Sequence, residues 1–141
     1  MIKNLDEKAA RKVLKEQRIG HLGCVLESGE PYIVPVNYLF KDDGIYVHSL
    51  PGQKLDALRV NGKICLQTEK IEKSCQWQSA IAFGEFQEVK RMNKKIEILK
   101  EFSARFERLT PVEAMIEEQW NLGGLVVFRL NIKRISGMAE S

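Results

Sequence analysis

The stretch from Tyr32 to Lys54 constrains the fold more than any other part of the sequence, because two strand patterns enclose a tight turn there. From Tyr32 to Phe40 the side chains alternate with a period of two, and this pattern predicts a strand covered on both sides. Lys41–Gly44 has turn chemistry, since Asp tolerates and Gly supplies positive φ. The return strand runs from Ile45 to Ser49, where Pro51 breaks it. The stretch therefore predicts a β-hairpin.

Pro35 lies in the middle of the first of these strands. Proline has no backbone N–H and cannot donate to a strand ladder, so this segment is predicted to be an edge strand or a bulge. Backbone groups at such a place are free to face a ligand.

The loop after the hairpin collects polar groups. Within seven residues, His48, Ser49, Gly52 and Lys54 bring together a ring nitrogen, a hydroxyl, a flexible backbone amide and an ammonium group. A helix pattern begins at about Gln53, and the free amides and dipole at a helix start favour an anion. The combination predicts a phosphate pocket.

Further strands and helices surround this centre. Gly84 is expected to mark a bulge in a long strand. The other predicted segments are strands at 19–26, 63–71, 75–89 and 125–135, helices at 6–16, 53–61, 91–106 and 111–118, and a tail at 136–141. Short hairpin turns without regular βαβ alternation favour a mainly β fold, a six-stranded antiparallel barrel with flanking helices. Residues 1–141 are expected to form a single domain.

Composition narrows the function classes. The 141 residues carry a formal charge of +3, which is too small and too scattered to indicate a nucleic-acid partner. No signal peptide or membrane-spanning run is recognisable, so a soluble cytoplasmic protein is expected. The three cysteines lack CxxC spacing and occupy strand-like segments, which favours buried thiols over a disulfide framework. With only two histidines and no ligand motif, no metal site is predicted.

Three segments in this order resemble a known family: IGHLGCVLESGEPYIVPVNYLF, IYVHSLPGQKLDALRVNGKICLQTE and WQSAIAFGEFQEV. Together, the PVNY, HS-x-x-G-x-K and W-x-S-x-x-x-x-G motifs resemble the flavin-binding split-barrel proteins related to pyridoxamine 5′-phosphate oxidase. The nearest branch is that of the nitroimidazole-resistance (Nim-like) proteins. The resemblance covers residues 19–89 and extends to the last strand.

The resemblance implies a six-stranded split barrel that forms a homodimer with FMN at the subunit interface. His48 is implied as a catalytic residue close to the flavin, and Trp77 and Ser79 as contacts that can come from the partner subunit. The cofactor-binding residues implied are Val34, Pro35, Val36, Asn37, Tyr38, His48, Ser49, Gly52, Lys54, Trp77 and Ser79.

The function implied is that of an FMN-dependent oxidoreductase acting on a small aromatic substrate, such as a nitroimidazole or another nitroaromatic. The alternative is a flavin- or haem-binding module without a dedicated substrate, because deazaflavin-using and haem-binding relatives share the barrel. Vitamin B6 oxidase activity is not expected, since Arg134–Gly137 departs from the arginine-containing substrate motif of the true oxidases.

Several site residues also have a purely structural interpretation. Asn37 can satisfy the strand ladder, Tyr38 can belong to the core, and Lys54 can be an exposed lysine at a helix start. Trp77 suits a dimer core as well as a flavin wall, and His48 can be a strand-end histidine bonded to backbone. Further residues weighed are Tyr32 as a core side chain, Arg59 as a weaker second cation, His21 as a structural histidine, and Trp120 and Asn121 as pocket residues packed from the far end of the chain.

Overall fold

The computed structural model describes residues 1–106 and 124–141. Within these ranges the elements are β1 (Ile2–Leu5), α1 (Glu7–Glu16), β2 (Ile19–Val25), β3 (Pro31–Asn37), β4 (Leu39–Lys41), β5 (Gly44–Ser49), α2 (Gln53–Val60), β6 (Lys63–Lys73), β7 (Gln76–Glu88), α3 (Met92–Arg105) and β8 (Val126–Glu140). The predicted helix at 111–118 lies outside the described residues, as do Trp120 and Asn121. No helix among the described residues is long and apolar enough to cross a membrane.

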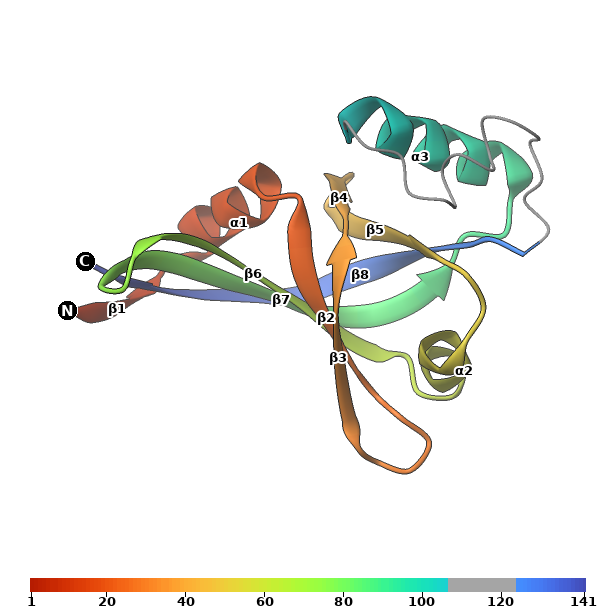
Figure 1. Cartoon of the computed structure of the whole chain (residues 1–141), viewed down its shortest axis with the longest axis horizontal. Helices are drawn as coiled ribbons and strands as arrows, with labels where there is room; N and C mark the ends of the chain where they lie inside the picture. Colours follow the sequence, from red (N-terminus) through yellow and green to blue (C-terminus); the bar gives the residue numbers. More distant parts are fainter. Residues whose placement is uncertain (107–123) are drawn as a thin grey trace.

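All strands belong to one antiparallel sheet that curls on itself (Figure 1). The order is β3-β2-β6-β7-β8-β5-β4, with β1 added alongside β8. The two ends of this order, β3 and β4, follow each other in the chain with only Tyr38 between them. The sheet is therefore an antiparallel split barrel, as predicted. The expectation of six strands was two short, because β1 was missed and one predicted strand is divided.

The division falls at Tyr38, in the middle of the strand predicted from Tyr32 to Phe40. The Tyr38 amide donates to the Arg18 carbonyl at 3.0 Å, and its hydroxyl donates to the Leu14 carbonyl at 2.6 Å. The side chain is fully buried. The amide bond continues the β2–β3 register by one residue, since Ile19 pairs with Asn37. The hydroxyl ties the buried side chain to α1, and the next residues pair with β5 as β4. As predicted for the segment with Pro35, β3 is an edge strand.

The hairpin turn between β4 and β5 uses its two aspartates. Asp42 and Asp43 have φ of 53° and 55°, which is the pair of positive values that a type I′ turn needs. Gly44 does not supply positive φ, contrary to the prediction. A Cβ at Gly44 would overlap the guanidinium group of Arg129, so this flexible side chain would have to shift to make room for it.

A bulge interrupts the pairing of β7 with β8 at Gly84, as predicted. Phe83 pairs with Arg134 and Gly84 with Ile132, which leaves Lys133 as the extra residue. Beyond the bulge β8 continues to Glu140, so the prediction of a tail was wrong. Gly137, near the end of this strand, packs closely enough on α1 that a Cβ there would lie 2.8 Å from the Ala10 Cβ.

Two apolar clusters hold the helices to the sheet. α1, which is capped by the Asp6 carboxylate at the Ala9 amide as predicted, joins α2 in the first cluster. α3 forms the second cluster with β4, β5 and β8. The first consists of Ala10, Val13, Leu14, Leu22, Cys24, Tyr38, Ile45, Val47, Leu55, Leu58, Ile64, Leu66, Ala80, Ala82, Val126, Phe128 and Leu130. The second consists of Leu39, Tyr46, Ile98, Leu99, Phe102, Leu125 and Val127.

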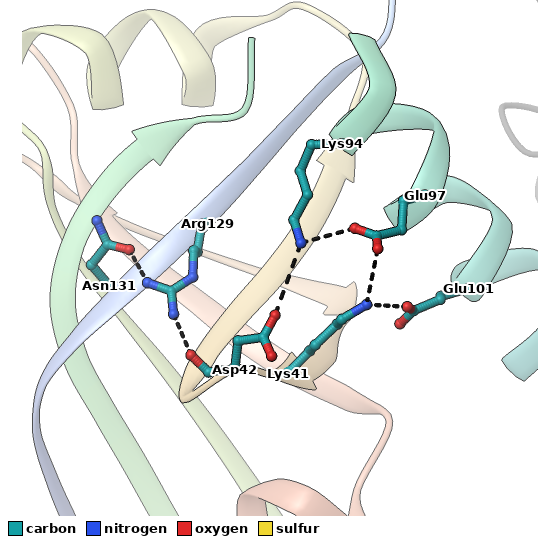
Figure 2. Close-up of polar contacts among 7 residues, drawn as sticks. All are labelled: Lys41, Asp42, Lys94, Glu97, Glu101, Arg129 and Asn131. Atoms are coloured by element: carbon teal, nitrogen blue, oxygen red, sulfur yellow. Dashed lines mark hydrogen bonds and ion pairs between the residues drawn. The ribbon is translucent and has the colours of Figure 1, made fainter. Parts of the chain in front are cut away.

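Ion pairs at the rim also tie α3 to the β4–β5 hairpin (Figure 2). Lys41 pairs with Glu101 and, at 3.8 Å, with Glu97. Lys94 pairs with Glu97 at 2.8 Å and with Asp42 at 3.9 Å. The hydrogen bond to Glu101 raises the pKa of Lys41, and that to Glu97 raises the pKa of Lys94. Solvent screens these exposed charges, so the pairs add little net stability, and the apolar cluster is the main attachment of α3.

Candidate functional site

The register of the sheet assigns its residues to two faces, because directly paired residues of antiparallel strands lie on the same face. Val34, Leu22, Leu66 and Ala82 pair in succession and belong to or pack against the first cluster. We call their side of the sheet the inner face. The opposite side, the outer face, carries Ile2, Ile19, His21, Gly23, Ile33, Pro35, Asn37, Cys65, Gln67, Glu69, Ile71, Trp77, Ser79, Ile81, Phe83, Arg134, Ser136, Met138 and Glu140.

The outer face exposes large apolar side chains. Ile33 is 70% exposed, Ile71 63%, Ile19 59% and Met138 46%. Single exposed apolar residues are ordinary, but several on one face of one sheet indicate a surface that another molecule covers.

Four of the predicted cofactor-binding residues lie on this face. Pro35 and Asn37 come from the edge strand β3, and Trp77 and Ser79 come from β7. The Trp77 ring nitrogen donates to a Glu140 carboxylate oxygen at 2.7 Å. Residues separated by about 40 positions in the sequence are thus brought to one side of the sheet.

The other predicted residues of β3 and its end turn inward. Val34 and Val36 pack against the first cluster, and the Tyr38 side chain belongs to it. Burial raises the pKa of Tyr38 to about 12. What this segment offers a ligand is its backbone, because an edge strand has one side without a neighbouring strand.

A cavity of about 580 Å³ lies against the sheet at β2, with Gly23 in its lining. This volume falls in the range of small-molecule pockets. Its lining is Gly23, Cys24, Val25, Pro31, Tyr32, Ile33, Lys63, Ile64, Cys65, Phe83 and Gly84. Sequence reasoning did not find this cavity, although a glycine inside a strand is a known sign of close approach by another group.

The three cysteines differ in how far they are buried. Burial raises the pKa of both the Cys24 and the Cys65 thiol. Cys24 is buried and Cys65 half-buried, as expected of small apolar side chains. Cys75 is exposed in the turn between β6 and β7, so its predicted burial in a strand was wrong.

His48 and Ser49 point to opposite faces of β5. Val47 belongs to the first cluster and Tyr46 to the second, so alternation places Ser49 on the side of the first and His48 on the side of the second. The His48 ring stands edge-on to Phe102 of α3, with centroids 4.6 Å apart. The Ser49 hydroxyl donates to the Leu50 carbonyl at 2.8 Å. One ligand atom cannot contact both side chains.

Lys54, in the first turn of α2, is the cation best placed for an anion. Its ammonium forms no hydrogen bond or ion pair with the part of the chain that the structure describes, and its side chain is half-buried. Desolvation lowers the pKa of Lys54, and its charge acts on the nearby Cys24 thiol. Arg59, the second predicted cation, is instead paired with Glu88 at 3.0 Å.

The start of α2 faces acidic groups on its other side. Gly52 caps the helix with extended backbone, and no atom lies within 4 Å of a Cβ built there. A cavity of about 430 Å³ beside Gly52 counts three acidic residues, Glu27, Glu30 and Asp56, among its lining. Three carboxylates repel an anion, so a phosphate group fits the Lys54 side of this helix and not the cavity.

A chain of polar groups crosses the outer face between the apolar rows. His21 Nδ1 lies 3.0 Å from Gln67 Oε1, and Gln67 Nε2 donates to Ser79 Oγ at 2.9 Å. His21 was predicted to be structural, and no sequence pattern indicates Gln67. Their alignment depends on the pairing of β2, β6 and β7, which no local pattern gives.

The edge strand, the curled antiparallel sheet and the uncovered outer face define a split-barrel domain. The pyridoxamine 5′-phosphate oxidase family profile matches residues 6–139. The chain belongs to this family, as the sequence motifs indicated.

Solved structures share the fold over the whole chain. A FAD-binding protein from Mesorhizobium loti has a TM-score of 0.78 and 25% identity and aligns over 100% of this chain and 99% of its own. The flavocytochrome Anf3 from Azotobacter vinelandii has a TM-score of 0.75 and 21% identity, covering 99% of this chain and 69% of its own. A candidate 5-nitroimidazole antibiotic resistance protein from Bacteroides thetaiotaomicron has a TM-score of 0.74 and 18% identity, with 99% and 89% covered.

Among curated sequences, an uncharacterized protein of Rhizobium meliloti is 37% identical over 71 residues. The match spans half of this chain and 46% of that protein.

Proposed function

We propose that this protein binds FMN and acts as an oxidoreductase on small aromatic substrates. The observation that carries the proposal is the Lys54 ammonium, which is half-buried without a carboxylate partner in the described residues. Desolvation makes such a charge unfavourable by itself, and a phosphate group would supply the missing counter-charge. The residues present therefore fit the phosphate end of this cofactor.

The edge strand would hold the ring system. The free side of β3 around Pro35 offers backbone groups to the polar edge of a planar ligand, while Val34 and Val36 anchor the strand in the core. When bound, FMN supplies the electron chemistry; the protein supplies binding, orientation and electrostatics.

His48 is our candidate for substrate positioning and for proton transfer at a ring nitrogen. An imidazole suits this role because its unperturbed charge change falls in the physiological pH range. Its ring lies at the end of β5 beneath Phe102, on the opposite face from Ser49. A substrate that stacks on a flavin ring is itself planar and aromatic, and the motif resemblance favours a nitro-substituted heterocycle.

We further propose that two copies associate through their outer faces. The exposed Ile19, Ile33, Ile71 and Met138 would be covered by the second copy. In such a dimer, Trp77 and Ser79 of one protomer would face a ligand held by Lys54 of its partner. The partner would thus complete the site.

An absorbance spectrum, taken after adding FMN and desalting, tests the proposal. Flavin bands that survive desalting in the wild type, weaken in Lys54→Ala and persist in Lys8→Ala are expected. Lys8 is an exposed lysine of α1 and serves as the control. Reduction by a nicotinamide nucleotide and reoxidation by a nitroaromatic compound would then establish the activity.

Three other outcomes of these measurements would favour a different function or refute the proposal. A Soret band instead of flavin bands would favour a haem-binding module, in line with the similarity to a flavocytochrome. Bound flavin that no donor reduces would favour a binding module without its own substrate. A colourless protein that retains no FMN would refute the proposal.

A further inference from the structure

The hydrogen-bond chain on the outer face has a defined direction. The Gln67 amide nitrogen lies 3.3 Å from the Thr68 carbonyl oxygen and 2.9 Å from Ser79 Oγ. A carbonyl oxygen only accepts, so the NH₂ group of Gln67 must face it, and the Gln67 Oε1 atom must face His21. The orientation of this amide is therefore fixed by chemistry.

The amide in turn fixes its two neighbours. Because Gln67 Oε1 can only accept, the proton of this contact lies on His21 Nδ1, 3.0 Å away. At the other end, Ser79 Oγ accepts from Gln67 Nε2 at 2.9 Å. The serine hydroxyl proton is then left to point away from Gln67. Glu69 Oε2, at 3.8 Å from His21 Nδ1, is too distant for a hydrogen bond.

We infer that His21 and Gln67 are positioning residues that hold the Ser79 hydroxyl as a hydrogen-bond donor toward a ligand on the outer face. The inference rests on the proposed function and specifies the chemistry that the ligand must present there, namely an acceptor such as a ring carbonyl oxygen or a bare ring nitrogen. Ser79 is half-buried, and the residues paired with it are Glu69 on β6 and Met138 on β8. A half-buried donor with a fixed direction discriminates between acceptor and donor groups.

The Gln67→Glu substitution tests the direction of the hydrogen bonds that join His21, Gln67 and Ser79. A carboxylate only accepts, so it keeps the bond from His21 but also takes the hydroxyl proton of Ser79. We expect FMN to bind roughly three- to tenfold more weakly, as in Ser79→Ala, which is the effect of one hydrogen bond. Gln78→Glu is the matched control, since it adds the same charge beside Ser79 but on the opposite face of β7. Equal weakening by both glutamates would overturn the inference, because charge alone would explain it.

Two further measurements separate this inference from the proposed function. In a Ser79→Ala background, Gln67→Glu should weaken FMN binding no further; an additional loss of the same size would show that Gln67 acts by another route. Independently of flavin, His48→Gln leaves His21 as the one histidine, and ¹⁵N NMR then reports its tautomer. A neutral His21 ring protonated at Nδ1 supports the hydrogen-bond chain, whereas a proton on Nε2 overturns the inference.

If Nδ1 carries the proton but the wild type retains no FMN, the hydrogen-bond chain stands. The proposed function and the role assigned to Ser79 would then both be rejected.

Discussion

The two faces of the β2, β3, β6, β7 part of the sheet have the same backbone and very different surroundings. On the inner face, Leu22, Leu66 and Ala82 are at most 1% exposed and lie within the first cluster. On the outer face, Ile19 and Ile33 remain more than half exposed, and a chain of polar side chains runs between them. Alternating residues of the same strands thus pack into the core on one side and stay exposed in a single chain on the other.

The two faces also differ in how far a single chain buries them. The centre of the inner face, at Leu22, Leu66 and Ala82, is buried within one chain, so its energetics follow from packing. The outer face is incomplete in one chain. Its large apolar side chains are exposed, and the Ser79 hydroxyl, which accepts a hydrogen bond from Gln67, can still donate one. The second copy and the flavin that we propose would complete it.

Truncation of neighbouring residues on the two faces should give the largest difference. Leu66 is fully buried, so Leu66→Ala should lower the free energy of unfolding by about 3 kcal/mol. Cys65→Ala, one residue away on the outer face, should lower it by less than about 1 kcal/mol. Denaturant unfolding at equal slope measures both values. Similar losses at the two positions would mean that the outer face is as closely packed as the inner one.

At the junction of β3 and β4, Tyr38→Phe should lower the free energy of unfolding by about 1 to 2 kcal/mol, since the Leu14 carbonyl loses its buried donor.

The Tyr38 hydroxyl also makes the free energy of unfolding depend on pH in the alkaline range. Because the folded pKa of Tyr38 is raised to about 12 from 10.0, the folded state keeps a proton that the unfolded chain releases. The contribution of Tyr38 is present below pH 10.0 and is lost as pH rises toward about 12. The difference between wild type and Tyr38→Phe should therefore shrink over that range. A difference that is constant with pH would contradict the burial of this hydroxyl.

Ile33→Ser probes the outer face. The side chain is mostly exposed in one chain, so unfolding of the monomer should change by less than about 0.5 kcal/mol. Association of two copies should weaken by at least about 1 kcal/mol for each side chain removed. Sedimentation velocity over a dilution series measures this effect. Unchanged association would exclude Ile33 from the interface.

The smallest effect is expected at the ion pairs of α3. Lys41→Met should change the free energy of unfolding by less than about 1 kcal/mol and should reduce its dependence on salt. Lys12→Met, which removes an exposed pair with Glu16 at 3.6 Å, is the control. A loss of several kcal/mol on Lys41→Met alone would show that charge, and not the apolar cluster, holds α3 in place.

Local chemistry made much of this fold predictable. The Asp6 cap, the bulge at Gly84 and the edge position of Pro35 each follow from the properties of a single residue, and each is found in the structure. The extension of β8 was not predictable in this way, because the small residue Gly137 gave no strand pattern. It belongs to the sheet through its pairing with Leu5 of β1 and Ala80 of β7.

The candidate site shows the same division. The family motifs selected Lys54, and the structure adds that its ammonium lacks a counter-charge among the described residues. The chain of His21, Gln67 and Ser79 could not be predicted, since a shift of one residue in the register of β6 would move Gln67 to the other face. Residues brought together by strand pairing require the structure.

Sedimentation of the protein with FMN, followed at both the protein and the flavin absorption bands, tests the central claim most directly. The account predicts that flavin sediments with a species of twice the chain mass, at one flavin per chain, and that Lys54→Ala releases it. Flavin that sediments with a single chain, or that stays behind while the protein sediments as a dimer, would contradict the account.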